Sequence, residues 1–241
     1  MHIKFGKMHN ESSSRKTLSR VLEEFVLNNE CAVEEIAKKI GKNYSTVLRA
    51  VRKLEKRGIV KLKRFQRTSK KGKEKRYYTI TFHGLVTYLA LNQEALKNIR
   101  KIAEAHSDML LTFKKWKKFV EAECEVVLKA NLIGALQISS FTYFSFFPYI
   151  SGGYMFPERD EKEREMFDAI LLGFPHFALP IQKLKEEEKE TFESLKKIWK
   201  VVEKDYELRL FRERYLHELE IEAKERMRNV EEWKHFLQGL T

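Results

Sequence analysis

Cysteine and proline are scarce in this chain, which has two of the former and four of the latter among 241 residues. Cys31 and Cys124 lie far apart, so they predict neither a disulfide framework nor a CxxC metal site, and we expect a reducing, cytoplasmic environment. The seven histidines show no metal-ligand spacing, and no Gly-rich phosphate loop occurs. The sequence therefore predicts no metal, no cofactor and no enzymatic activity.

Net charge is almost absent outside one segment. Residues 42–76 contain fifteen Lys or Arg and only two Glu, a net charge of +13, whereas the whole chain carries +12. A basic excess confined to one segment is typical of a surface that binds the phosphate backbone of nucleic acid. A merely solvated charged face is the alternative, and it does not explain why the excess coincides with a fold pattern.

That fold pattern is two short helices joined by a tight turn. The first helix has apolar residues with helical spacing and would end at Gly41, because glycine enters the left-handed conformation without steric penalty. Asn43 is expected to cap the second helix with its side chain, and this helix would stop at Gly58. The apolar positions are Val33, Ile36, Ala37 and Ile40 in the first helix, and Val47, Ala50, Val51 and Leu54 in the second.

A basic hairpin follows the second helix. Ile59 to Phe65 and Arg76 to Thr81 predict two β-strands that flank a polar tip, Gln66 to Lys75. A preceding helix begins at Ser13 or Ser14, with apolar positions at Leu18, Val21, Leu22, Phe25 and Val26, and another begins at Thr81. Together these elements predict a winged helix-turn-helix domain over residues 14–92, preceded by a flexible arm, residues 1–13.

Three motifs carry a resemblance to a known family. They are STV at Ser45–Val47, LEKRGIV at Leu54–Val60 and YTIT-x-x-G at Tyr78–Gly84. With them, residues 15–92 resemble winged helix-turn-helix transcription regulators of the MarR/ArsR-like type, archaeal ones in particular. The resemblance implies that the second helix and the wing contact DNA, while terminal helices pair two subunits.

The second helix, residues 43–57, is the expected recognition element in the major groove, and the basic wing, residues 61–76, is expected on the backbone or in the minor groove. Arg can pair with guanine through two hydrogen bonds, whereas the wing lysines would position phosphates. Capping alone is the other interpretation of Ser45 and Thr46. The candidate DNA-binding residues are Asn43, Tyr44, Ser45, Thr46, Arg49, Arg52, Lys53, Lys63, Arg64, Arg67, Lys70, Lys71, Lys73, Lys75 and Arg76.

Residues 93–241 predict an all-helical domain with long helices that serves dimerisation or effector binding. Residues 92–129 would form two helical segments, broken at Asn92 or Ser107. Gly152-Gly153 and the charged PERDEKERE, Pro157–Glu165, would mark a surface turn before the next helix. From Ile181 to Leu240 the chain predicts almost uninterrupted helix, as one amphipathic helix or a helical hairpin. Its apolar spacing is not a strict heptad, so a perfect coiled coil is not indicated.

Residues 130–157 carry no charge, and three interpretations stay open. The segment is a buried helix and loop, an effector pocket, or a membrane segment. Two features count against the membrane segment: polar residues interrupt it, and residues 169–181, its potential partner, are too short for a second membrane span. The pocket would be lined by Phe141, Tyr143, Phe144, Phe146, Phe147, Tyr149 and Tyr154.

The sequence as a whole predicts a mainly α protein that binds double-stranded DNA as a transcription regulator, as a homodimer that reads a palindrome, with a small-molecule or protein effector as a further partner. Two alternatives are a winged-helix protein-interaction adaptor and a membrane-associated regulator anchored through residues 130–157. Adaptors rarely carry such a concentrated positive charge.

Overall fold

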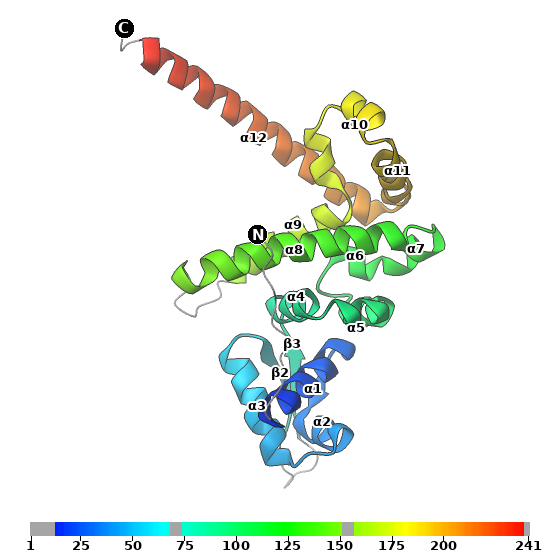
Figure 1. The fold of residues 1–241 in the computed structure, drawn as a ribbon, viewed down its shortest axis with the longest axis vertical. Helices are drawn as coiled ribbons and strands as arrows, with labels where there is room; N and C mark the ends of the chain where they lie inside the picture. Colours follow the sequence, from blue (N-terminus) through cyan, green and yellow to red (C-terminus); the bar gives the residue numbers. More distant parts are fainter. Residues whose placement is uncertain (1–12, 68–73, 151–156, 239–241) are drawn as a thin grey trace. The chain divides into compact units, whose positions relative to one another are not determined.

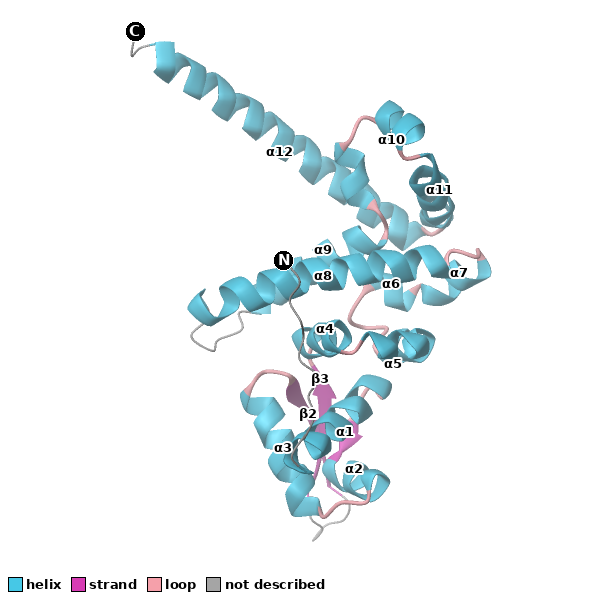
Figure 2. Ribbon diagram, in the orientation of Figure 1, coloured by secondary structure: helices cyan, strands magenta, loops and turns pink. Residues whose placement is uncertain are grey.

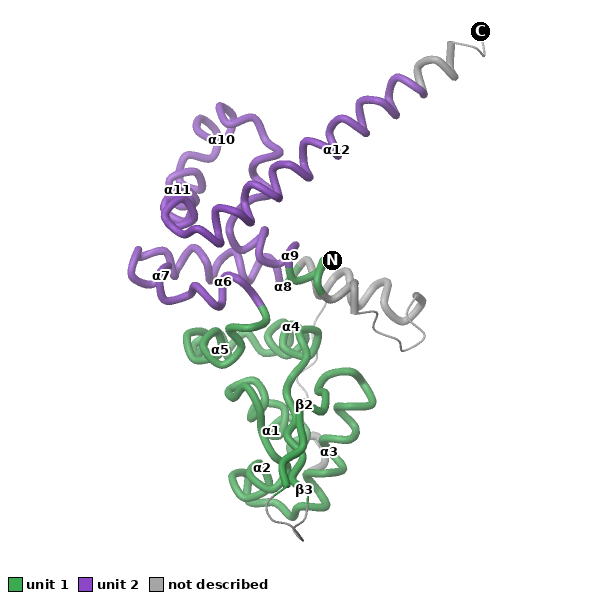
Figure 3. Tube along the Cα trace, turned by 180° about the vertical axis from the view of Figure 1, so that it is seen from behind, with its two compact units in different colours: residues 1–109, 136–164 green, residues 110–135, 165–241 purple. Residues whose placement is uncertain are grey.

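The computed structural model describes residues 13–67, 74–150 and 157–238. The chain forms two compact units, each made of two stretches of sequence (Figure 3). Unit 1 contains residues 1–109 and 136–164, and unit 2 contains residues 110–135 and 165–241. The domain boundaries expected from the sequence, 1–13, 14–92 and 93–241, stay a prediction.

Unit 1 begins with a winged helix-turn-helix, as predicted (Figures 1 and 2). Its sheet is antiparallel with the strand order β1-β3-β2. The elements are α1 (Ser13–Leu27), β1 (Cys31–Ala32), α2 (Val33–Ile40), α3 (Tyr44–Lys56), β2 (Val60–Arg67), β3 (Glu74–Ile80) and α4 (Phe82–Leu91). Strand β1 was not predicted, because two residues are too short to show a period.

The core of this domain is built from the apolar positions that the helical period predicts. Phe25 of α1, Ile36 of α2, Val51 of α3 and Ile80 of β3 are almost completely buried. Burial of such side chains stabilises the fold by about 1.5–3 kcal/mol each. Gly41 has φ 65°, so the tight turn between α2 and α3 depends on a glycine in the left-handed conformation, as predicted.

The segment between α4 and residue 124 differs from the prediction of two helices. It breaks at Asn92 and after Ala105, as expected, but also near Lys115 and Ala122. The pieces are η1 (Gln93–Asn98), α5 (Ile99–Ala105), α6 (Leu111–Lys114) and α7 (Trp116–Glu121). The side chain of Asp168 accepts hydrogen bonds from the N–H groups of Leu111 and Thr112, which favours the start of a new helix there.

The other elements are α8 (Glu125–Ile150), α9 (Pro157–Leu171), η2 (Phe174–Ala178), α10 (Ile181–Glu187), α11 (Lys189–Lys204) and α12 (Tyr206–Gln238). The surface turn was wrongly expected to include PERDEKERE, because these residues begin α9, with Pro157 at a position where its missing N–H costs nothing. Gly152 and Gly153, the other part of the expected turn, lie outside the described residues. Leu128, Leu132, Phe174 and Ile198 are fully buried and form much of the core of unit 2.

The stretch from Ile181 to Leu240, expected to be one amphipathic helix or a helical hairpin, is divided into three helices. The breaks lie at Glu188 and Asp205, neither of which is a proline or glycine. The side chain of Asp205 accepts from the N–H groups of Glu207 and Leu208, at 3.0 and 3.1 Å, so it caps α12. No helix in the described ranges is long and apolar enough to cross a membrane.

Candidate nucleic-acid interface

Helix α3 separates its apolar and basic residues onto opposite faces. Val47, Val51 and Leu54 are buried against the domain core, whereas Arg52 and Lys53 are exposed. Arg49 is exposed too, and its Nε donates to the carbonyl oxygen of Ser45 at 3.3 Å. These cations therefore lie on the outward face of α3, where the sequence pattern placed them.

The first turn of α3 presents polar groups to solvent. Asn43, Tyr44 and Ser45 are exposed, Tyr44 by 43%, and Thr46 is half-buried. Asn43 occupies the N-cap position, but its side chain makes no capping hydrogen bond, so the expected capping role was wrong. The backbone carbonyl of Asn43 accepts from Thr46 and Val47, while its exposed amide side chain, which makes no capping bond, is available to a ligand.

The hairpin is longer than predicted and contains a β-bulge. Leu62 pairs with Tyr78 and Arg64 pairs with Tyr77, so Lys63 is the extra residue. Side chains alternate between the two faces of a strand, and the bulge shifts this alternation by one residue. Beyond it, Phe65 and Arg76 share the face of Tyr78 and Ile80, while Arg64 shares the other face with Tyr77.

The face that carries Arg64 is neutralised by two carboxylates. Arg64 Nε donates to Glu30 Oε1 at 3.0 Å, and Lys63 Nζ lies 3.9 Å from Glu30 Oε2. On the same hairpin, Lys75 Nζ donates to Glu35 Oε1 at 2.7 Å. The hydrogen bond from Arg64 lowers the pKa of Glu30, and the hydrogen bond from Lys75 lowers the pKa of Glu35. Both acids are therefore ionised at neutral pH and hold these cations.

Tyr77 reinforces the same arrangement. The Arg64 guanidinium lies 3.9 Å from the centroid of the Tyr77 ring, and Lys75 Nζ lies 5.0 Å from it. Attraction between a cation and the face of an aromatic ring fixes both side chains over Tyr77. Three predicted DNA-binding residues, Lys63, Arg64 and Lys75, are thus engaged within the domain.

The opposite face of the hairpin has a different character. Phe65 is 51% exposed, and the Arg76 guanidinium lies 5.7 Å from its ring centroid. This face continues from Tyr78 and Ile80, which pack toward the helices, and β2 contacts α3. Arg67 and Arg76 are exposed on this face, where Glu74 lies opposite Arg67 across the strands, and no ion pair involves either arginine among the described residues.

Sequence reasoning missed Glu30, Glu35 and Phe65. Glu35 had a signal, since a Glu three residues into a helix can accept from the N-cap N–H, and its Oε2 accepts from Ala32 at 3.2 Å. Glu30 and Phe65 had none, because their roles follow from the bulge at Lys63. The predicted wing residues Lys70, Lys71 and Lys73 lie outside the described residues.

The structure does not describe the side chains of the aromatic residues that were predicted to line an effector pocket. Residues 141–149 belong to α8, but their side chains lie outside the described part, as does Tyr154 altogether. The effector pocket stays a prediction. In the parts of the chain that the structure describes, no group of three His, Cys, Asp or Glu side chains could hold a metal ion.

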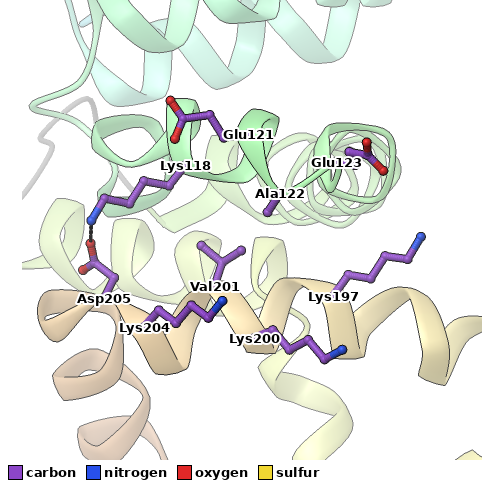
Figure 4. A pocket seen from close by; sticks show the side chains of 9 residues that line it. All are labelled: Lys118, Glu121, Ala122, Glu123, Lys197, Lys200, Val201, Lys204 and Asp205. Carbon is purple, nitrogen blue, oxygen red and sulfur yellow. Dashed lines mark hydrogen bonds and ion pairs between the residues drawn. The ribbon is translucent and has the colours of Figure 1, made fainter.

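Unit 2 contains a cavity of about 600 Å³ between α7 and α11 (Figure 4). Lys197, Lys200 and Lys204 line it from α11, and Glu121 and Glu123 line the other side. Lys118 Nζ donates to Asp205 Oδ2 at 2.6 Å at one end. Because charges of both signs line this cavity, it does not share the purely basic character of the α3 surface.

No curated protein and no solved structure matches the chain. Residues 14–61 match the model of a family described as winged helix-turn-helix DNA-binding, and this range includes α1, α2, α3 and the start of β2. The match agrees with the observed fold, and the segment that carries the exposed cations of α3 is similar to DNA-binding domains of the winged helix-turn-helix type.

Proposed function

We propose that the chain is a sequence-specific, DNA-binding transcription regulator that acts in the cytoplasm as a homodimer and has no enzymatic activity. Its assignment to the MarR/ArsR-like, archaeal type is part of the proposal. The observation that carries it is the outward face of α3, where Arg49, Arg52 and Lys53 are exposed within a segment similar to DNA-binding domains.

In this proposal α3 enters the major groove with its N-terminal end first. Asn43 and Ser45 are exposed there, and amide and hydroxyl groups can donate to and accept from base edges. Arg49 and Arg52 follow one and two turns later and can each pair with guanine through two hydrogen bonds. These four residues would set the recognised sequence.

The hairpin would then contact the sugar-phosphate backbone with the face that carries Phe65. Arg67 and Arg76 are exposed on this face and Glu30 and Glu35 neutralise the other one, so the charge distribution favours one orientation of the wing. Phosphate contacts add affinity and fix the register of the protein on the duplex without reading sequence.

The experiment is selection of bound duplexes from a random library, followed by measurement of Kd for the selected site and for random duplex by fluorescence anisotropy. We expect a selected palindrome, and we expect Arg49→Ala with Arg52→Ala to lower the preference for it at least about tenfold, since each good Arg–guanine pair contributes about 1–3 kcal/mol of discrimination.

The matched control is Lys183→Ala with Lys196→Ala, which removes two exposed cations from helices of unit 2 and should leave the preference unchanged. A library from which the wild-type chain selects no sequence would overturn the proposal. Equal loss of preference in the control and in the α3 variant would overturn the role of α3.

A further inference from the structure

The second half of α12 extends past α10 and α11 of the same unit (Figures 1 and 3). Every described side chain from Glu220 to Glu232 is exposed. Large apolar residues are among them, with Met227 72% and Val230 52% exposed, and Leu216 just before this stretch is 41% exposed. An exposed apolar stripe on a projecting helix indicates a surface for a partner.

The apolar residues form one narrow stripe. At ~100° per residue, Leu216, Leu219, Met227 and Val230 all lie within about 40° of the direction of Ala223 around the helix. Ala223 is the midpoint of the stripe, with Leu216 and Val230 seven residues away on either side and Leu219 and Met227 four residues away. The small side chain at the midpoint would let a second helix approach closely.

Within one turn of Ala223, the charges that flank this stripe reverse their sign. Glu220 and Glu222 precede it, and Lys224 and Arg226 follow it. Within the helix, Lys224 Nζ pairs with Glu220 Oε1 at 2.7 Å, and Arg226 pairs with Glu222 at 3.4 Å. Glu220 and Lys224 therefore lie on one flank of the stripe, and Glu222 and Arg226 lie on the other.

We propose that α12 pairs in antiparallel orientation with α12 of a second copy, about a two-fold axis beside Ala223. In this pairing each flank of one helix faces the same flank of the other helix, and the two chains run in opposite directions. Glu220 then lies about 3 Å along the axis from the partner's Lys224, and Glu222 lies equally close to the partner's Arg226. Leu216 is level with the partner's Val230, so the apolar stripe covers itself.

A parallel pairing of the same two helices brings like charges together. Each flank would then face the other flank at the same level, which places Glu220 beside the partner's Glu222 and Lys224 beside the partner's Arg226. Flanking charges are a main determinant of orientation in paired helices. In this central turn the sign reversal thus favours the antiparallel arrangement, with four opposite-charge pairs against the like-charge approach of Glu213 and Glu231 at the ends of the stripe. This self-complementarity points to a second copy of this chain as the partner.

This inference deepens the dimeric form of the proposed function, on which it rests for its biological role, but it does not depend on DNA binding. Sedimentation of the full chain over a micromolar concentration range tests it without DNA. We expect a dimer, and we expect Leu219→Glu with Met227→Glu to weaken self-association at least about tenfold, because charges would be buried in the stripe.

The control for this surface is Ile221→Glu. Ile221 is 44% exposed but points about 160° away from Ala223, so the variant should remain a dimer. A wild-type chain that stays monomeric, or a Leu219→Glu with Met227→Glu variant that dimerises as well as wild type, would overturn the inference. Circular dichroism establishes that each variant keeps its helical content.

Disulfide trapping tests the orientation. We expect Ala223→Cys to cross-link with itself under oxidation, and Leu216→Cys to cross-link only when mixed with Val230→Cys, because two copies of position 216 would lie about 21 Å apart. Wild-type chain is the control, since Cys31 and Cys124 are buried. Self-linking of Leu216→Cys as fast as that of Ala223→Cys would overturn the antiparallel pairing. A chain that dimerises in this way but selects no DNA would refute the proposed function alone.

Discussion

Gly84 occupies a position at which a single methyl group decides whether the wing and α4 can pack. A Cβ atom there would clash with the backbone carbonyl of Ile59 and crowd the side chain of Ile80. The same region is fixed by Thr81, whose Oγ1 donates to the carbonyl oxygen of Gly58 at 2.7 Å and accepts from the N–H of Gly84 at 3.0 Å. The turn after α3 and the start of α4 are therefore held at a fixed separation.

We expect Gly84→Ala to lower the free energy of unfolding by about 1–3 kcal/mol, because the backbone of Ile59 must move. A Cβ atom at Gly134, in α8, would meet nothing within 4 Å, so Gly134→Ala should raise stability by about 0.5–1 kcal/mol. Urea unfolding followed by circular dichroism compares the two. Changes of the same sign would refute this explanation of Gly84.

At the scale of elements, the helical period and turn glycines predicted α1 to α4 and both long hairpin strands. Gly41 has the expected left-handed conformation, and Val47, Val51 and Leu54 are buried as their spacing indicated. These features are local, so a short stretch of sequence specifies them. The α3 part of the candidate site was predictable for the same reason.

Features that depend on distant partners were not predictable. The bulge at Lys63 leaves no sequence signal, yet it decides which hairpin cations meet Glu30. The breaks at Glu188 and Asp205 were missed because neither residue stops a helix on its own. Asp205 becomes a boundary where its side chain caps α12 and meets Lys118 of α7, which lies far away in the sequence.

Asp205 gives a prediction for the junction of α11 and α12. Although burial opposes ionisation, hydrogen bonds from Lys118, from the N–H of Leu208 and from Lys115 lower the pKa of Asp205 to about 2. We expect Asp205→Ala to lower the free energy of unfolding by about 2–4 kcal/mol at neutral pH, and Asp205→Asn, which keeps a capping oxygen, to cost less.

The pH dependence of this difference follows from the sign of the shift. A carboxyl group whose pKa is lower in the folded protein than in the unfolded chain stabilises the fold at pH values above its ordinary pKa, which is 3.8 for Asp205. This contribution is lost as the pH falls toward 2. The stability difference between wild type and Asp205→Ala should therefore shrink between about pH 4 and pH 2. A difference that stays constant in thermal melts across this window would argue against an ionised Asp205.

At the scale of the whole molecule, the basic excess is not a uniform charge. Glu30 and Glu35 bind Lys63, Arg64 and Lys75, while the cations of α3 remain exposed. Net charge alone would make every cation of residues 42–76 equivalent for DNA. The observed pairing instead divides them into those available to phosphate and those already engaged.

This division predicts a graded salt dependence of DNA binding. Loss of one phosphate contact reduces the slope of log K against log salt by about one. We expect that reduction for Arg76→Ala, but a much smaller one for Lys75→Ala, whose ion pair with Glu35 occupies it in the free protein. Titrations at several salt concentrations measure both slopes. Equal reductions would mean that the wing exchanges its carboxylate partners for phosphate.

The extra residue in β2 also has a consequence for how this hairpin tolerates insertions and deletions. Because Lys63 is the residue of β2 without a partner in β3, its removal would leave Arg64 opposite Tyr77 and Phe65 opposite Arg76, each on the face that it occupies now. Removal of a paired residue such as Phe65 would instead move Arg67 opposite Lys75 and so onto the face that Glu30 and Glu35 neutralise. Relatives that are one residue shorter in β2 should therefore lack the bulge residue and keep the paired ones.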